Sequence, residues 1–114
     1  MADCLFCNII QKKIPADIVF ENETILAFKD IQPQAPIHIL IIPKVHISSL
    51  SELEEIHKNL MGELIFTASM IAKEFNIDED GYRTNFNCKE NGGQTVYHIH
   101  LHLLGGRKFS WPPG

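Results

Sequence analysis

The sequence predicts an α+β fold, with one domain over residues 1–114 and an antiparallel sheet of five strands. The chain is long enough for one hydrophobic core but not for two. Its apolar runs follow one another as a short helix, a hairpin, a strand, a long helix and two further strands. Successive strands that are joined by short links pair antiparallel, which gives the expected sheet.

The first elements are defined by short apolar runs between turn residues. Residues 4–11 have apolar positions at helical spacing and stop before Pro15, which predicts a short helix. Residues 18–20 and 24–28 are rich in β-branched and aromatic side chains. Because residues 21–23 between them are typical of a turn, we expect a hairpin.

The middle of the chain predicts a loop, a central strand and the long helix. Prolines in residues 32–36 suit neither a helix interior nor a central strand. The run 38–42 is apolar except for its first residue, which indicates a central strand. Ser51 and Glu54 form a capping box for a helix that reaches about Phe75. Its buried stripe is expected to contain Leu53, Ile56, Leu60, Leu64, Ala68, Ile71 and Phe75.

The last part of the chain predicts two strands and an irregular tail. Residues 82–87 alternate as a strand, and a glycine-rich turn at 91–93 leads to the strand 98–104. Trp111 lies in a proline-rich tail, which favours a contact with another surface. His57 falls off the helical stripe and is expected to be solvated and without function. Cys88 is expected to be an ordinary strand residue.

His98, His100 and His102 occupy alternate positions, so we expect them on one sheet face, with the helices covering the other face. Polar side chains on the wet side of a strand would explain such a row only in part. A metal site is a second interpretation, but the row spreads over ~13 Å at ~3.3 Å per residue, too far for one ion. A third interpretation fits a row better: one imidazole attacks an electrophile while its neighbours bind charge or move protons.

The composition is that of an ordinary globular protein, with 45% hydrophobic and 21% charged residues. A net charge of -4 argues against broad nucleic-acid binding, which uses a basic face. The chain has no apolar run of membrane-spanning length, and its first residues lack the regions of a signal peptide. Three cysteines, an odd number, fit a reducing compartment. We therefore expect a cytoplasmic protein that binds neither membranes nor nucleic acids.

The segment from His98 to Leu104 has the motif His-x-His-x-His followed by two apolar residues. This motif resembles the signature of the histidine triad superfamily. The similarity extends over nearly the whole chain, through IPADIVFENE, LAFKDIQPQAPIHILIIPKVHI and GGQTVYHIHLHLLGGR to the ending WPPG. The LGGR and WPPG segments favour the Hint branch, which contains purine nucleoside phosphoramidases. The resemblance therefore implies the fold of this superfamily.

The resemblance also implies a two-step hydrolysis of purine nucleoside 5′-phosphoramidates. His100 would attack the α-phosphorus and form a nucleotidyl-histidine, and water would then release the nucleoside monophosphate. His102, the Thr95 hydroxyl and the backbone of Gly93 would donate to the developing charge. Two alternatives stay open: a dinucleoside polyphosphate hydrolase, and a nucleotide-binding interaction module with vestigial catalysis.

Further site residues follow from the same resemblance. His98 and His38 would orient the nucleophilic ring, and Gln94 or Asn87 would line the phosphate and leaving-group side. Asp30 would accept hydrogen bonds from the ribose hydroxyls. The base would lie between apolar side chains, which are Phe6, Ile9, Phe28 and Ile31.

Members of this branch are homodimers in which two five-stranded sheets join into one continuous sheet. The resemblance therefore implies a homodimer for this chain. The C-terminal tail would reach toward the active site of the partner, so that Trp111 would touch both the interface and the substrate.

The pair Cys4 and Cys7 has the spacing of many zinc ligands, but such a pair alone is a weak signal. Some members of the superfamily place this pair beside two histidines, which correspond to His46 and His98. The resemblance thus implies a structural zinc site, while the competing interpretation is two reduced cysteines on a short helix. Catalysis by the phosphoryl route requires no cofactor in either case.

Overall fold

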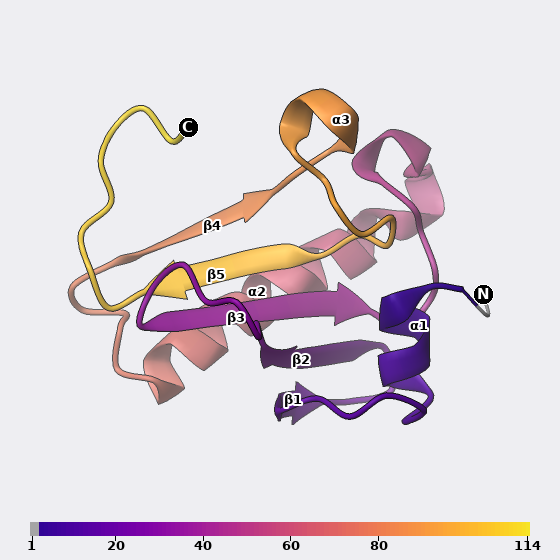
Figure 1. Ribbon diagram of the computed structural model, residues 1–114, viewed down its shortest axis with the longest axis horizontal. Coiled ribbons are helices and arrows are strands. Elements are labelled where there is room, and N and C mark those ends of the chain that lie inside the picture. The colour runs from indigo at the N-terminus through magenta and orange to yellow at the C-terminus, as the bar shows by residue number, and fades with distance from the viewer. Residues whose placement is uncertain (1–2) are drawn as a thin grey trace.

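The computed structural model describes residues 3–114 and contains one five-stranded sheet with the order β1-β2-β3-β5-β4 (Figure 1). All neighbouring strands pair antiparallel, which confirms the α+β prediction. The strands are β1 (Ile18–Glu21), β2 (Ile25–Lys29), β3 (Ile37–Pro43), β4 (Tyr82–Phe86) and β5 (Leu101–Gly105).

Strand β3 lies in the middle of the sheet, as its apolar sequence predicted. It is buried from His38 to Pro43 and pairs with β2 on one side and β5 on the other. The register places Leu40 opposite both Phe28 and His102. Side chains of three strands therefore meet at one point on one face of the sheet, and the candidate site is built there.

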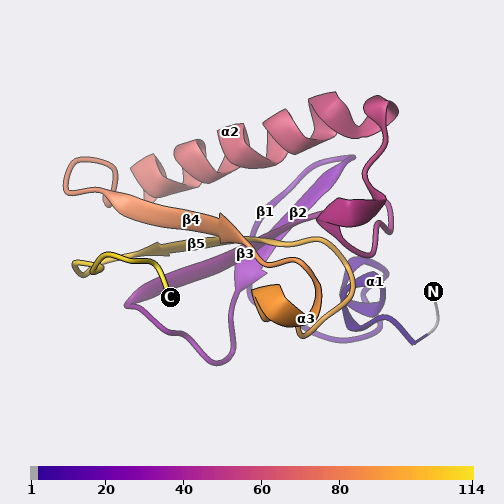
Figure 2. The same ribbon diagram turned by 90° about the horizontal axis from the view of Figure 1, so that it is seen from above.

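Helix α2 (Lys58–Glu74) covers the opposite face of the sheet (Figure 2). Because side chains alternate along a strand, every second residue of β2, β3 and β5 faces this helix. The core between them includes Ile25, Ala27, Ile39, Ile41, Leu64, Ala68, Ile71, Leu101 and Leu103. None of the helices in residues 3–114 is long and apolar enough to cross a membrane.

Helix α1 (Leu5–Ile10) packs on the same face as the histidines, so the expectation that both helices cover the other face is wrong. The reason is that β2 and β3 are apolar on both faces. Since α2 covers only one of these faces, the other needs its own cover. Phe6 and Ile9 of α1 provide it by packing against Leu26, Phe28, Leu40 and Ile42.

Helix α2 begins later than the sequence predicted. Two short 3₁₀ turns, Leu50–Glu52 and Glu55–His57, precede it, and Glu54 rather than Ser51 caps the second turn. The imidazole Nδ1 of His57 accepts the backbone N–H of Glu54 at 2.9 Å, so this histidine has a structural role. Ile56, expected in the buried stripe, is 84% exposed because it lies in the turn and not in the helix.

The glycine-rich turn and the histidine strand also differ from expectation. Residues Lys89–Gly92 form a single helical turn, α3, which ends at Gly93 with φ of 79°. Strand β5 begins only at Leu101, so His98 and His100 lie before it. This stretch is held instead by residues that follow β3, where the Ile99 N–H donates to the Ile47 carbonyl at 2.8 Å.

The loop of residues 31–36 packs against the end of β5 through Gly106. This glycine has φ of 91°, and a Cβ there would lie 2.8 Å from the Cβ of Pro36. The contact requires glycine for two reasons, because both the backbone conformation and the proline ring exclude a side chain. The loop, which follows Asp30, is thereby packed against the end of β5.

Gly106→Ala is expected to lower the free energy of unfolding by about 1–3 kcal/mol, from backbone strain and overpacking. The matched control is Gly62→Ala in α2, where a Cβ would have no neighbour within 4 Å. That control is expected to raise stability by about 0.5–1 kcal/mol, because alanine favours the helix. Urea unfolding of both variants measures the difference. Equal stabilities would contradict the packing described for Gly106.

Candidate active site

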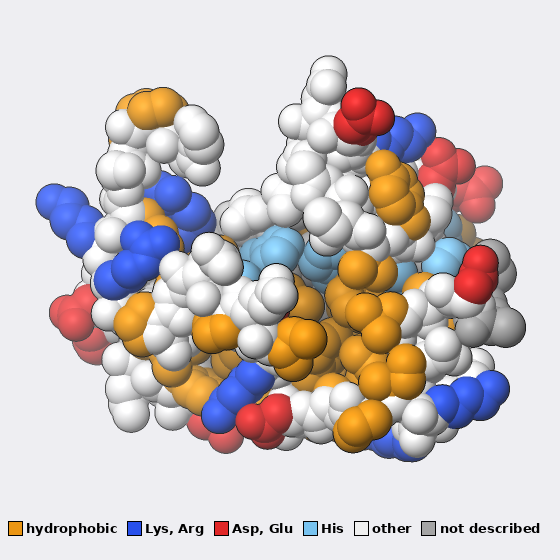
Figure 3. Space-filling model, in the orientation of Figure 1, with side chains coloured by type: hydrophobic (Ala, Val, Ile, Leu, Met, Phe, Trp, Pro, Cys, Tyr) orange, Lys and Arg blue, Asp and Glu red, His pale blue; other side chains and the backbone are white. Residues whose placement is uncertain are grey.

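A cavity of about 490 Å³ lies on the α1 face of the sheet. In Figure 3 histidine side chains are seen in a hollow above a band of apolar side chains. The cavity brings together most of the residues predicted for catalysis and nucleotide binding: Phe6, Ile9, Phe28, Asp30, Ile31, His38, Thr95, His100 and His102.

The lining of the cavity is divided into an apolar and a polar part. The apolar part includes residues that the sequence analysis did not select, which are Leu5, Ile14, Pro15, Ala16, Leu40 and Val96. Ile14, Pro15 and Ala16 lie between α1 and β1, in a segment whose sequence has no regular hydrophobic spacing. The polar part includes Gln32 and Gln34 in the loop after β2. A ligand with a flat apolar ring at one end and a polar, anionic group at the other would match this division of the lining.

His100 is held as a neutral ring with one free nitrogen. Its Nδ1 lies 2.8 Å from the carbonyl oxygen of His98. Because a carbonyl oxygen only accepts, Nδ1 carries the proton and Nε2 keeps its lone pair. Phe6 packs edge-on against this ring at 5.1 Å between centroids, and His100 is only 7% exposed. Such an imidazole is a nucleophile that needs no deprotonation.

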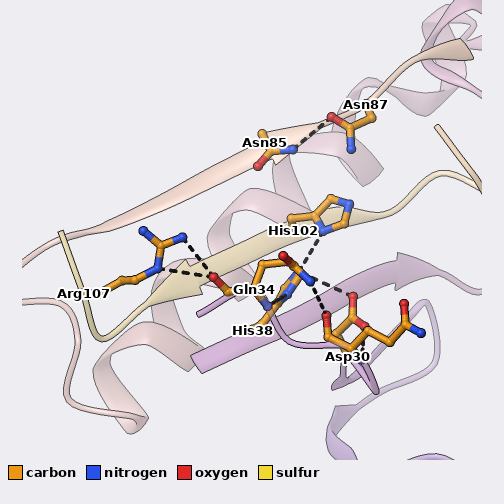
Figure 4. A network of polar contacts seen from close by, with 8 residues as sticks. Asp30, Gln34, His38, Asn85, Asn87, His102 and Arg107 are labelled. Carbon is orange, nitrogen blue, oxygen red and sulfur yellow. Dashed lines mark hydrogen bonds and ion pairs between the residues drawn. The ribbon is translucent and has the colours of Figure 1, made fainter. Parts of the chain in front are cut away.

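His38 and His102 form a hydrogen-bonded chain with a defined direction (Figure 4). The backbone N–H of Gln34 donates to His38 Nδ1 at 3.0 Å, so the proton of this ring lies on Nε2. His38 Nε2 lies 3.0 Å from His102 Nδ1, which must therefore accept. The proton of His102 is left on Nε2, which is buried without a hydrogen-bond partner. His102 thus offers a donor beside the nucleophile, at 4.9 Å between ring centroids.

Burial keeps these imidazoles neutral at physiological pH. It lowers the pKa of His102 to about 4, assisted by the neighbouring His100 and His38 rings. Burial likewise lowers the pKa of His100, although the hydrogen bond to the His98 carbonyl acts in the opposite direction. The pKa of His38 is also lowered by burial, against the attraction of Asp30. Neutral rings avoid the cost of placing several buried positive charges side by side.

Asp30 follows β2 and lies at the polar end of the cavity. Its Oδ1 accepts the backbone N–H of Gln32 at 2.8 Å, and its Oδ2 lies 3.5 Å from His38 Nε2. Asp30, His38 and His102 are close enough to suggest a metal site. A metal at His38 Nε2 would force the proton onto Nδ1, where it would face the Gln34 N–H. These residues therefore form a hydrogen-bonded chain that disfavours a metal ion.

The two histidines expected to orient His100 act differently from that expectation. His98 orients His100 through its backbone carbonyl and not through its ring. His38 contacts His102 instead of His100. Sequence spacing could not distinguish these arrangements, because the backbone carbonyl and the ring belong to the same residue.

Some predicted binding residues do not line the cavity. The Gln94 amide is engaged by the backbone: Oε1 accepts from Lys89, and Nε2 donates to the Ser48 and Val96 carbonyls at 2.7 and 3.0 Å. Asn87 accepts from Asn85, which pairs with His102 across β4 and β5 (Figure 4). Trp111 is 84% exposed, and Gly93 lies at the end of α3.

The second cluster consists of Cys4, Cys7, His46 and His98 at the other end of the histidine row. The two sulfur atoms lie 3.4 to 3.6 Å from histidine Nδ1 atoms, and the two Nδ1 atoms are 3.2 Å apart. A tetrahedral zinc with Zn–S of about 2.3 Å and Zn–N of about 2.0–2.1 Å places sulfur and nitrogen ligands about 3.5 Å apart and two nitrogen ligands about 3.3 Å apart. The donor set therefore fits zinc in both chemistry and spacing.

The surroundings of the cluster also fit a metal site. His98 is fully buried, and its Nε2 lies 2.8 Å from the Pro43 carbonyl, so Nε2 carries the proton and Nδ1 faces the cluster. Burial lowers the pKa of His98 to about 4, which keeps its Nδ1 lone pair available. Cys88 lies apart, at the start of α3 and not in a strand, with its thiol 3.4 Å from Ser51 Oγ.

The chain is similar to known proteins over nearly its whole length. The 14 kDa zinc-binding protein of Zea mays is 52% identical over 112 residues, which cover 96% of this chain and 87% of that protein. The adenylylsulfatase HINT1 of Arabidopsis thaliana is 49% identical, covering 96% of this chain and 76% of that protein. A HIT family hydrolase from Legionella pneumophila superposes with a TM-score of 0.97 at 52% identity, covering 98% of this chain and 100% of that chain.

The family model of the HIT domain matches residues 11–109, which include the cavity loop and all three alternating histidines. The similar structure from Legionella pneumophila carries the same family name. The chain therefore belongs to the HIT domain family, the histidine triad proteins, as the motif from His98 to Leu104 predicted.

Proposed function

We propose that the chain is a hydrolase that transfers a nucleotidyl group from a purine nucleoside 5′-phosphoramidate to His100 and then to water. The observation that carries this proposal is the pairing of two neutral rings in one cavity. His100 has a free Nε2 lone pair, and His102 beside it has an Nε2 proton without a partner. A nucleophile next to a donor suits attack on phosphorus, where negative charge develops on oxygen.

In the first step the Nε2 lone pair of His100 forms a bond to the α-phosphorus, and the phosphorus–nitrogen bond breaks. The leaving nitrogen takes up a proton from solvent and departs as an amine. In the second step a water oxygen attacks phosphorus and releases a proton to solvent, while the electron pair of the bond to His100 returns to Nε2. The nucleoside monophosphate leaves and the neutral ring is restored. His102 donates to a phosphate oxygen in both steps, and the Thr95 hydroxyl lines the same cavity.

The remaining lining supports a nucleoside as the carrier of that phosphate. Asp30 has carboxylate lone pairs beyond the one used by Gln32, so it accepts from ribose hydroxyls. The apolar part of the cavity, formed around Phe6, Ile9 and Phe28, encloses a flat base. The exposed Ile31 forms the rim of this slot.

The same attack serves other leaving groups at the α-phosphorus. The Arabidopsis relative is named an adenylylsulfatase, which favours adenylyl sulfate as a second substrate, with sulfate leaving in place of the amine. Comparing turnover of adenosine 5′-phosphoramidate, adenylyl sulfate and diadenosine polyphosphates ranks the three activities. The highest kcat/KM is expected for the phosphoramidate.

His100→Ala is expected to reduce kcat for adenosine 5′-phosphoramidate by at least ~10⁴-fold, because the covalent step has no other nucleophile. Affinity for adenosine monophosphate is expected to stay within about threefold, since the base and ribose contacts remain. Steady-state kinetics and calorimetric titration measure the two quantities. His57→Ala, outside the cavity, is the histidine control. A His100→Ala variant with near wild-type kcat would disprove the assignment.

The pH dependence of kcat/KM follows from the burial of His100. Because burial lowers the pKa of His100 below the ordinary 6.5, the ring stays neutral and active at pH 6.5 and loses activity only when the pH falls below its lowered pKa. Phe6→Ala admits water to the ring and is expected to move the acid limb upward, toward pH 6.5. Profiles of the wild type, Phe6→Ala and Ile31→Ala measure this. The Ile31 variant is expected to raise KM without moving the limb, and identical limbs in all three would refute the desolvation argument.

We also propose that Cys4, Cys7, His46 and His98 hold a structural zinc ion. When bound, the metal supplies a cross-link between the N-terminal residues, the segment after β3 and the histidine row. Its ligands come from three parts of the chain: the start of α1, the segment after β3 and the stretch before β5. The zinc-binding name of the maize relative supports this proposal.

Protein purified without chelator is expected to contain about one zinc ion per chain by elemental analysis. Cys7→Ser is expected to lose most of the metal and to unfold at lower urea concentration, whereas Cys88→Ser keeps both properties. A chelator should lower the stability of the wild type but not that of Cys7→Ser. Wild-type protein with less than about a tenth of an equivalent would end the proposal.

We further infer that two chains form a homodimer, as the family resemblance implies. Helix α2 exposes apolar side chains on the face turned away from the sheet: Ile65 is 54% exposed, Phe66 62% and Met70 39%. Burial of such a surface favours association. In a dimer the exposed Trp111 of one chain would approach the active site of the other.

A further inference from the structure

We propose that Arg107 is a positioning residue that fixes the hydrogen-bond donor of His102 through the loop of residues 31–36. The inference rests on the proposed function, because it explains how the donor beside the nucleophile is kept in one orientation. Arg107 lies after β5, outside the cavity, and is connected to His102 through Gln34 and His38 (Figure 4).

The first contact is between Arg107 and the backbone of Gln34. Nη2 and Nε of the guanidinium donate to the Gln34 carbonyl oxygen at 2.9 and 3.3 Å. The guanidinium itself has two further contacts: Nη1 donates to the Lys108 carbonyl at 3.2 Å, and Cζ lies 4.2 Å from the centroid of the Phe109 ring. A planar fork held in this way defines the position of the carbonyl it binds.

The second contact, between Gln34 and His38, sets the tautomer of the His38 ring. The N–H of Gln34 donates to His38 Nδ1 at 3.0 Å, and this bond keeps the His38 proton on Nε2. If Gln34 moved away, His38 would be free to exchange the proton between its nitrogens. Gln34 is an exposed residue of a proline-containing loop, and the contact with Arg107 restrains its backbone.

The third contact passes this constraint to the site. His38 Nε2 donates to His102 Nδ1 at 3.0 Å, so the His102 proton lies on Nε2, the buried atom without a partner. If the His38 proton were on Nδ1, His38 Nε2 would accept a hydrogen bond. His102 would then carry its proton on Nδ1 and donate it to His38 Nε2. His102 Nε2 would then carry a lone pair in place of its proton, and a lone pair repels a phosphate oxygen.

Arg83 offers a matched control for the charge and the aromatic contact of Arg107. Its guanidinium lies 5.1 Å from the centroid of the same Phe109 ring, and its Nη2 donates to the Ser110 carbonyl at 2.8 Å. These contacts hold the C-terminal segment and not the loop of residues 31–36. Loss of Arg83 therefore reports on tail packing and net charge without removing the clamp on Gln34.

The experiment compares Arg107→Ala, Arg107→Lys and Arg83→Ala by kinetics on adenosine 5′-phosphoramidate and by ¹⁵N NMR of the imidazole nitrogens. Arg107→Ala is expected to lower kcat roughly 10- to 100-fold with little change in KM, because the donor acts in the transition state. Arg107→Lys, which still donates to the carbonyl, should recover part of this loss. In the NMR spectra the wild type should show His102 protonated at Nε2, and Arg107→Ala a mixture of tautomers.

The inference is overturned if Arg107→Ala keeps the wild-type kcat, or loses no more than Arg83→Ala does. It is also overturned if His102 stays protonated at Nε2 to the same extent in Arg107→Ala. A wild-type protein that fails to hydrolyse the phosphoramidate would refute the proposed function instead, and the NMR comparison would still decide the role of Arg107. If Arg107→Ala does not fold, the tautomers and kcat of Arg107→Lys decide, since a single donor holds the loop less firmly than the fork.

Discussion

The hydrogen bond from His100 Nδ1 to the carbonyl of His98 is the interaction on which the site depends. At 2.8 Å it fixes the proton on one nitrogen and leaves the other as a lone pair in the cavity. The position of that carbonyl is itself fixed, because the His98 ring is bonded to Pro43 at the end of β3 and lies within the cysteine and histidine cluster. The nucleophile is thus oriented by the central strand and not by a flexible loop.

Two arrangements of histidine occur in one row, and burial explains why they coexist. At one end His98 turns Nδ1 toward two thiols, which suits a metal. At the other end His102 Nδ1 accepts a hydrogen bond from His38 of β3, which leaves the His102 proton on Nε2 as a donor. Each ring has one nitrogen assigned by a backbone group or a neighbour, so no ring needs to be charged. Charged rings at this spacing in a buried row would repel one another strongly.

Much of the fold and part of the site could be predicted from the sequence. Alternating histidines and the apolar run of β3 are local patterns, whereas Asp30 was selected through the family resemblance. The structure brings His100, His102 and Asp30 together in the lining of one cavity. The side of the sheet that α1 covers was not predictable, because β2 and β3 are apolar on both faces. Gln34 and Gln94 act through or upon backbone groups, and no side-chain pattern in a sequence reveals such contacts.

The most direct measurement of the central claim is the mass of the protein during turnover. Rapid acid-free quenching of the reaction with adenosine 5′-phosphoramidate, followed by peptide mapping, should find one adenylyl group on the imidazole of His100. An adenylyl group on His98 or His102, or full turnover with no labelled histidine at any time point, would contradict the account.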